Sequence, residues 1–199
     1  MPNNQSTLSI SFCLKTSFCI LLWSLFMLAC SSVVNQSDIP SQIVKQFLEW
    51  ESKEQPNGVY PSIRSQQLDA LLSSELQCLL DAALTANQAS KRIAPDEKPP
   101  FIEGNIFLPV AWERPLGYKI MASRLDGESS SVEVNFLYEP NGLNFTSTYW
   151  LSRQSGSWKI IDISLGGECD FCQKGKLREA MYDTLSHYPE ANSNRCKTI

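Results

Sequence analysis

The sequence VEVNFLYE, residues 132–139, decides the fold of the second half of this chain. An apolar side chain stands at every second position from Val132 to Tyr138, and most of the positions between are polar. A period of two puts the apolar side chains on one face of a β-strand and the polar ones on the other. The stretch therefore predicts a strand whose one face lies in a hydrophobic core.

Three further runs have the composition of strands, and short turns join all four. These runs are residues 118–125, 145–154 and 158–165. The turn signals between them are Asp126-Gly127, Pro140-Asn141-Gly142 and Ser155-Gly156. Turns this short connect antiparallel strands, because a parallel connection needs a long crossover. The second half is therefore predicted to be an antiparallel meander.

Helical periodicity marks the residues on both sides of the predicted sheet. A first helix is predicted from Asp38 to about residue 54, with an apolar face, and Gln55-Pro56-Asn57-Gly58 ends it. A second helical stretch surrounds residues 68–72. The motif Ser74-Glu75-Leu76-Gln77 resembles a capping box that opens a third helix. Residues 177–185 predict a last helix that packs on the sheet.

Residues 93–117 contain five prolines, which are incompatible with regular structure over most of this segment. The segment also contains large apolar side chains, among them Phe101, Phe107 and Trp112. Such a composition is too hydrophobic for a free linker. We therefore expect this segment to pack across the domain or to form the rim of a cavity.

The leader of the chain ends in the tetrapeptide Met27-Leu28-Ala29-Cys30 after a short apolar run, residues 18–28. This pattern resembles the bacterial lipoprotein box, in which cleavage occurs just before a cysteine that carries acyl chains. The resemblance implies a signal peptide at 1–29, lipidation of Cys30, a tether at 30–38 and one α+β domain at 39–199. It also implies an outer-membrane protein that faces the periplasm, because Ser31 follows the cysteine.

Two other interpretations of the leader stay open. Ordinary signal cleavage after Ser31 would release a soluble protein. An uncleaved apolar anchor at residues 18–34 would instead hold the chain in the membrane, although this run is short for a membrane span. A lipidated Cys30 would instead hold the cleaved protein on the membrane surface. Each buried methylene of the acyl chains contributes about 0.8 kcal/mol to membrane binding, so that more than one chain makes anchoring durable.

The formal net charge of the chain is −4, and acidic and basic residues are mixed along it. Nucleic-acid binding proteins instead present clustered basic residues, so we expect no nucleic-acid partner. The sequence also contains a single histidine, His187, and one CxxC motif. These are too few ligands for a zinc site, and we expect neither a metal nor a cofactor.

Four cysteines remain in the expected mature domain besides Cys30, namely Cys78, Cys169, Cys172 and Cys196. An even number in an oxidising compartment predicts disulfides, and three pairings are open. We expect structural disulfides that tie the C-terminal segment to the body of the domain. The alternative is a redox-active pair in Cys169-Asp-Phe-Cys172, although the βαβ pattern of a thioredoxin-like fold is missing.

The order of the predicted elements resembles the cystatin-like cone of the nuclear-transport-factor-2-like superfamily, over residues 39–188. A closer resemblance is to an uncharacterised group of bacterial lipoproteins with that fold. The matching segments are VKQFLEW at 44–50, Pro100-Phe101, GSWKIIDI at 156–163, Gly167 and GKL at 175–177. The resemblance implies N-terminal helices packed on a curved antiparallel sheet, with a C-terminal helix. Cys78 and the Asp-Phe-Cys172 segment are not part of the family pattern.

The enzyme hypothesis requires a carboxylate in an apolar pocket. The candidates are Asp162 and Glu133, with Tyr118 or Tyr149 as hydrogen-bond donors for proton abstraction next to a carbonyl. The alternative is that Asp162 faces water or a backbone amide. We prefer this alternative, because the spacing of these residues does not bring them together.

The binding hypothesis uses the same cavity without chemistry, or the outer face of the sheet. Its aromatic candidates are Trp112, Tyr149 and Trp150. We prefer a non-enzymatic binding module that is tethered to the membrane and takes an envelope protein or a small apolar ligand. A periplasmic immunity or inhibitor protein is a variant of this function, and a small cone-fold enzyme is the alternative.

Overall fold

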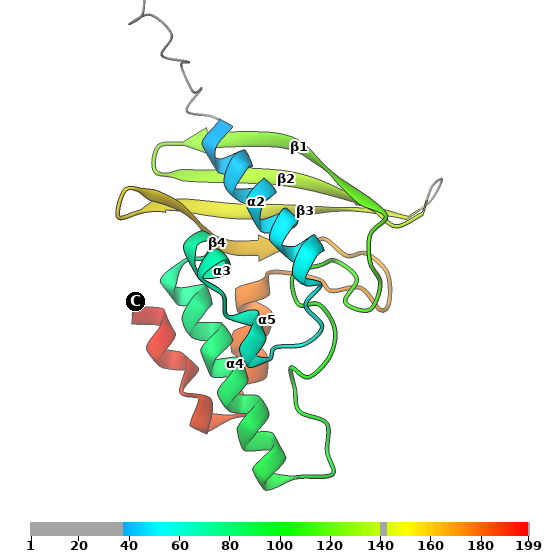
Figure 1. The fold of residues 1–199 in the computed structure, drawn as a ribbon, viewed down its shortest axis with the longest axis vertical. Helices are drawn as coiled ribbons and strands as arrows, with labels where there is room; N and C mark the ends of the chain where they lie inside the picture. The colour runs from blue at the N-terminus through cyan, green and yellow to red at the C-terminus, as the bar shows by residue number, and fades with distance from the viewer. Residues whose placement is uncertain (1–37, 140–142, 199) are drawn as a thin grey trace, which may run out of the picture. The chain divides into compact units, whose positions relative to one another are not determined.

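In the computed structural model, four antiparallel strands form one sheet in the order β1-β2-β3-β4 (Figure 1). The strands are β1 Gly117–Asp126, β2 Ser129–Leu137, β3 Asn144–Gln154 and β4 Ser157–Ser164. Each predicted run overlaps one strand and differs from it only at its ends, so the predicted meander is confirmed. The structure describes residues 38–139 and 143–198. The predicted signal peptide, Cys30 and nearly all of the tether lie outside the described residues.

The turn between β3 and β4 shows how the sequence produces this topology. Ser155 and Gly156 both have positive φ angles, 49° and 82°. Two-residue turns of this kind match the twist of the paired strands, and glycine adopts the conformation without steric cost. The predicted hairpin at this position is confirmed.

The alternation seen in residues 132–139 separates the two faces of the sheet. Val132, Val134 and Phe136 of β2 are fully buried, whereas Glu133 is only half-buried on the opposite face. In β3 the buried side chains likewise alternate with more exposed ones, and Tyr149 is buried while Trp150 is not. One face of the sheet is therefore core, and the other is an outer face.

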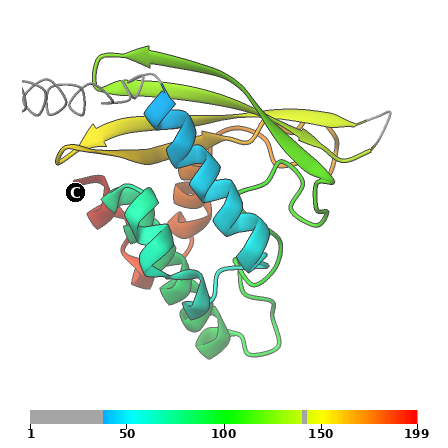
Figure 2. The same ribbon diagram turned by 45° about the horizontal axis from the view of Figure 1, so that its top comes forward.

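The described residues contain four α-helices, α2 Asp38–Glu54, α3 Gln66–Leu71, α4 Ser74–Ile93 and α5 Leu177–Ser186. Short 3-10 helices occur at Pro61–Ile63, Pro189–Ala191 and Ser193–Thr198. Helix α2 crosses one face of the sheet, and α4 and α5 lie beside each other beyond β4 (Figures 1 and 2). The fold is therefore α+β, with a C-terminal helix.

An aromatic cluster fills the space between α2 and the sheet. The ring of Phe47 on α2 lies 5.3 Å from that of Phe107 and 5.7 Å from that of Tyr149, measured between centroids. Trp50, one turn further along α2, lies 5.8 Å from Phe107. Edge-on pairs of this kind stabilise a core beyond their buried area. The cluster positions the C-terminal end of α2 against the sheet and the segment that contains Phe107.

The capping box predicted at Ser74 was wrong by one residue. The cap of α4 is Ser73, whose Oγ accepts a hydrogen bond from the amide of Leu76 at 3.2 Å. The amide of Ser73 donates to Ile160 of β4, and the residue is extended as a cap requires. The side chain of Gln77 does not turn back to the cap. It donates instead to carbonyls at the end of α3, because these also need partners.

Residues 94–116 contain no helix or strand, as their prolines predict. The segment is held by polar contacts with the region after α2. The amide of Val59 donates to the carbonyl of Phe101, and the side chain of Asn87 on α4 binds both of these residues. This segment therefore packs across the domain as an ordered connection.

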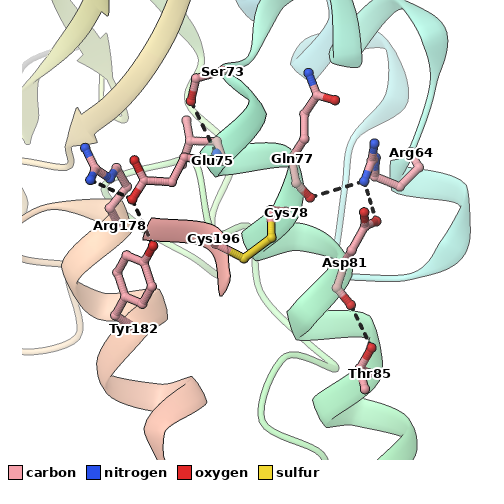
Figure 3. Close-up of a disulfide and its surroundings, with 11 residues drawn as sticks. Arg64, Ser73, Glu75, Gln77, Cys78, Asp81, Thr85, Arg178, Tyr182 and Cys196 are labelled. Carbon is pink, nitrogen blue, oxygen red and sulfur yellow. Dashed lines mark hydrogen bonds and ion pairs between the residues drawn. A yellow bond between two sulfur atoms is a disulfide. The ribbon is translucent and has the colours of Figure 1, made fainter. Parts of the chain in front are cut away.

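The C-terminal segment is joined to α4 by the disulfide Cys78–Cys196 (Figure 3). Beside it, Oε1 of Glu75 accepts hydrogen bonds from Arg178 at 2.6 Å and from the Tyr182 hydroxyl at 2.8 Å. These contacts join α4 to α5 independently of the disulfide. The predicted attachment of the C-terminal segment to the body of the domain therefore has one covalent and one polar component.

The second disulfide joins Cys169 and Cys172 within the loop between β4 and α5. The amide of Gln173 holds this loop against the rest of the domain by donating to the carbonyl of Pro109 at 2.7 Å. Within the loop, the amide of Gly167 donates to the carbonyl of Gln173 at 3.0 Å. The disulfide thus closes a short loop that contacts the connection before β1. A redox role for this pair stays a prediction.

Candidate functional site

A cleft of about 400 Å³ lies where α2 ends, which is within the usual size range of ligand sites. It is formed by the turn after α2 on one side and by part of the 94–116 connection on the other. The lining residues are Gln55, Pro56, Asn57, Asn105, Leu108, Ala111, Trp112, Glu113 and Arg114. The predicted cavity rim in residues 93–117 is confirmed by this arrangement.

The first wall of the cleft depends on an unusual end of α2. The amide of Gln55 closes the helix by donating to Glu51 at 2.9 Å, and Gln55 has a positive φ of 50°. This left-handed conformation usually belongs to glycine or asparagine at a helix end. A glutamine there costs conformational free energy, and such positions cluster at functional sites.

The second wall is held by hydrogen bonds from three directions. The amide of Asn105 donates to Ala111 at 2.8 Å, and the side chain of Gln173 donates to the carbonyls of Asn105 and Leu108, each at 2.7 Å. The side chain of Asn57 accepts from the amide of Gly104 at 2.7 Å and so joins the two walls. The cleft is therefore a preformed feature of the fold.

A buried carboxylate lies behind the cleft. Glu51 is 3 % exposed, and its Oε1 accepts a hydrogen bond from Nδ2 of Asn105 at 2.8 Å. Burial raises the pKa of Glu51 above 4.5, although the positive charge of Arg114 and the Asn105 hydrogen bond act in the opposite direction. Asn105 lines the cleft, and Glu51 does not. The amide therefore stands between the carboxylate and the ligand space.

The negative charge of Glu51 also acts on two buried tyrosine hydroxyls. Burial raises the pKa of Tyr138 to about 12 and that of Tyr149 well above 10, and Glu51 adds to both shifts. Tyr138 accepts a hydrogen bond from the amide of Val110 at 3.4 Å. The hydroxyl of Tyr149 and Nε1 of Trp50 are buried without a partner among the described residues. The core beneath the cleft is thus polar as well as aromatic.

Three of the sequence-predicted site residues lie in or near this region. Trp112 lines the cleft and is 62 % exposed. Tyr149 is fully buried in the core. Tyr118 is half-buried on β1. Burial raises the pKa of Tyr118, and the negative charges of Glu49 and Glu51 raise it further. The charge of Glu51, which was not among the candidates, thus contributes to the raised pKa of both predicted tyrosines.

The other three candidates lie elsewhere. Asp162 is buried at the edge of the sheet, where Oδ1 accepts from the amides of Ile163 at 2.9 Å and Arg178 at 3.1 Å. It therefore binds the first turn of α5. Glu133 and Trp150 lie on the outer face, and Nε1 of Trp150 donates to Ser164 at 3.0 Å. None of the three lines the cleft.

Sequence analysis did not select Glu51 and Asn105, the buried pair behind the cleft. For Glu51 a signal was present, because it continues the apolar face of α2 three residues after Leu48 and four after Phe47. A carboxylate on a buried helix face needs a partner. For Asn105, in an irregular segment, the sequence contains no comparable signal.

A second hollow, of about 480 Å³, lies between the start of α2 and the β3–β4 turn. It is lined partly by apolar side chains, among them Ile39, Ile43 and Trp158. None of its polar lining residues is buried. The cleft at the end of α2 is the stronger candidate, because a buried polar side chain faces it.

No protein-family model matches this chain, and no curated protein is similar to it at a significant level. In the part of the chain that the structure describes, no helix has the length and apolar character needed to cross a membrane. Within the same residues, no three or more histidine, cysteine, aspartate or glutamate side chains are grouped to hold a metal ion.

Proposed function

We propose that this protein is a non-enzymatic binding module of the bacterial cell envelope. It is tethered to the outer membrane through Cys30, faces the periplasm and holds its ligand in the cleft at the end of α2. The main support is the cleft itself, in which an exposed Trp112 and several polar side chains surround the opening. The arrangement of α2 over an antiparallel sheet supports the cystatin-like cone as the fold.

The tether is proposed from the sequence that precedes the domain. The lipoprotein box at Met27–Cys30 precedes the first described helix by few residues. A domain anchored there would stay close to the membrane surface. The membrane is the first partner, through acyl chains on Cys30, and an envelope protein is the second partner in this proposal.

Binding is favoured over catalysis because of the position of Glu51. Among the described residues, it is the only carboxylate with a shifted pKa, and it does not reach the ligand space of the cleft. Glu51 is hydrogen-bonded to Asn105 and lies behind it. A general base must instead come within hydrogen-bond distance of the proton that it removes. An immunity or inhibitor protein is a variant of the proposal, with a partner's side chain in the cleft.

The tether and the ligand are tested separately. Mature protein extracted from membranes should carry an acyl-glyceryl adduct on Cys30, and Cys30→Ser should leave unprocessed precursor. Native mass spectrometry of the same protein should detect a small bound molecule that Trp112→Ala reduces. A soluble product that begins at Ser32 would contradict the tether, and an empty cleft in both proteins would contradict ligand binding.

A small enzyme with a pocket carboxylate is the second candidate. The observation in its favour is that Glu51 combines a raised pKa with the unpartnered hydroxyl of Tyr149 nearby. Labelling of the folded protein with a water-soluble carbodiimide and an amine separates the two functions. Rapid labelling of Glu51 would show that the carboxylate is accessible and would favour the enzyme. Protection of Glu51 together with labelling of exposed Glu113 would favour binding.

A further inference from the structure

The charged side chains around the cleft indicate which net charge of a ligand the cleft does not favour. Arg114 and Glu113 bring one positive and one negative side chain to the lining, and Glu51 lies behind it as a buried carboxyl whose pKa is raised. No cluster of like charges faces the cleft, so neither a multivalent anion nor a cation is favoured there. The cleft is thus suited to a ligand without net charge.

The polar groups of the lining are available to such a ligand. The side chains of Gln55, Glu113 and Arg114 make no hydrogen bond or ion pair with any other residue that the structure describes. Together they offer both donors and acceptors. A ligand rich in hydroxyl groups, each of which donates and accepts, would match this mixture.

Trp112 supplies a flat apolar surface beside these groups. Trp112 is 62 % exposed, an unfavourable state for a large aromatic side chain in water. Nζ of Lys98 lies over one face of the ring, 5.7 Å from its centroid, and Lys98 itself pairs with Glu103. Gly104 lies beside the ring, since an added Cβ at this position would be in ordinary van der Waals contact with Cη2 of Trp112, at 3.6 Å. The ring thus has neighbours on the protein and leaves apolar surface open to a ligand.

We propose that the cleft binds a sugar ring of a neutral glycan, whose C–H face would stack on Trp112 while its hydroxyl groups bond to Gln55, Glu113 and Arg114. This inference rests on the proposed binding function and specifies the ligand of the same cleft. A sugar ring combines an apolar face with hydroxyl groups around its edge. The cleft offers complementary surfaces for both, and its volume of about 400 Å³ suits one or two sugar rings.

The test is calorimetric titration of the full mature protein with the trisaccharides chitotriose and cellotriose, and with trialanine as a non-sugar probe. At least one trisaccharide should bind with a Kd of about 1 mM or tighter, which corresponds to a weak but specific complex. Trp112→Ala should weaken this binding about tenfold or more, as truncation of an aromatic contact residue typically does.

Two variants separate a binding role from a structural one. Trp150→Ala removes another partly exposed tryptophan with a lysine over its ring, but on the outer face of the sheet. The affinity of the Trp150→Ala variant for the glycan should stay within about twofold of wild type. A loss this small is below what truncation of an aromatic contact residue typically causes. Gln55→Gly relieves the left-handed backbone and should raise the unfolding midpoint, yet it should weaken glycan binding.

Each outcome bears on the inference. Failure of both trisaccharides to bind, or equal losses for Trp112→Ala and Trp150→Ala, would overturn it. Binding of trialanine alone, sensitive to Trp112→Ala, would overturn the glycan ligand and leave the proposed binding function standing. No binding of any probe, together with no co-purified molecule in native mass spectrometry, would overturn both.

Discussion

At the scale of single residues, the most unusual feature is a carboxylate inside the core. Glu51 lies among aromatic side chains on the buried face of α2, and the amide of Asn105 is its hydrogen-bond partner. Burial of a charge is unfavourable unless it is paired, and here the charge of Arg114 compensates only in part. We therefore expect Glu51 to make stability depend on pH.

The substitution Glu51→Gln tests this expectation. Because the folded-state pKa of Glu51 is raised above 4.5, the unfolded chain releases the proton first as the pH rises. The contribution of Glu51 to stability is then fully present below pH 4.5 and is lost as the pH rises through the folded-state pKa. Glu51→Gln keeps an oxygen for Asn105 and has no proton to release. Its free energy of unfolding relative to wild type should increase across this range.

Urea unfolding at a series of pH values measures this difference. The exposed substitution Glu179→Gln on α5 is the control for the removal of a carboxylate in general. A difference between Glu51→Gln and wild type that does not change with pH would mean that the core does not disfavour the ionised form of Glu51.

Gly166, two residues after the end of β4, is a second residue with a specific requirement. It has a φ of 68°, and an added Cβ would lie 2.0 Å from the backbone oxygen of Thr146. Gly127 has a similar φ of 57° but no atom within 4 Å of an added Cβ. Gly127→Ala should cost about 1 to 2 kcal/mol for the left-handed backbone alone. Gly166→Ala should cost clearly more in chemical denaturation, because backbone must also move. Equal losses would show that the loop after β4 can withdraw from β3.

At the scale of elements, the position of α5 follows from its apolar spacing. Leu177, Met181 and Leu185 stand at i, i+4 and i+8, and all three are at most 2 % exposed. The predicted last helix is confirmed, with one residue more than expected at its end. Asp162 from β4 and Glu75 from α4 bind its N-terminal half through polar contacts. The helix is thus held by a buried face and by its neighbours.

The substitution Met181→Ala should lower the free energy of unfolding by about 2 to 5 kcal/mol, because it leaves a cavity between α5 and the rest of the core. The exposed change Glu179→Ala on the same helix should stay within about 0.5 kcal/mol of wild type. Thermal and urea unfolding of both variants provide the measurement. Small, equal effects would contradict the docking of α5.

At the scale of the whole molecule, the disulfide Cys78–Cys196 closes a loop with a sequence separation of 118 residues. It joins the third-to-last residue of the described chain to α4, and Cys196 is fully buried. Cys169–Cys172, in contrast, spans a sequence separation of only 3. The two disulfides should therefore differ in how strongly they restrict the unfolded chain.

Replacing both cysteines of each pair with alanine tests this difference. In the chain-entropy model the long loop contributes about 5 kcal/mol and the short one about 2 kcal/mol. The Cys78→Ala, Cys196→Ala variant should therefore have the lower unfolding midpoint of the two. A larger loss for the Cys169→Ala, Cys172→Ala variant would indicate that the short loop stabilises the native state through its contacts with the 94–116 connection.

The sequence alone determined the features that depend on local spacing. Alternation in residues 132–139, the turn residues Ser155-Gly156 and the apolar face of 177–185 each reflect a repeat or a backbone preference within one element. These signals predicted the four antiparallel strands and the helices that flank them. The proline-rich segment likewise predicted an irregular connection, because five closely spaced prolines are incompatible with helix or strand over most of its length.

Tertiary structure alone decided which residues meet. Asn105 binds Glu51 from 54 positions away, and the four cysteines allowed three pairings until the fold placed Cys196 against α4. Asp162 and Glu133, although both lie on strands, point to other parts of the molecule than the cleft. Contacts between distant residues depend on how whole elements pack, and no local repeat in the sequence encodes that packing.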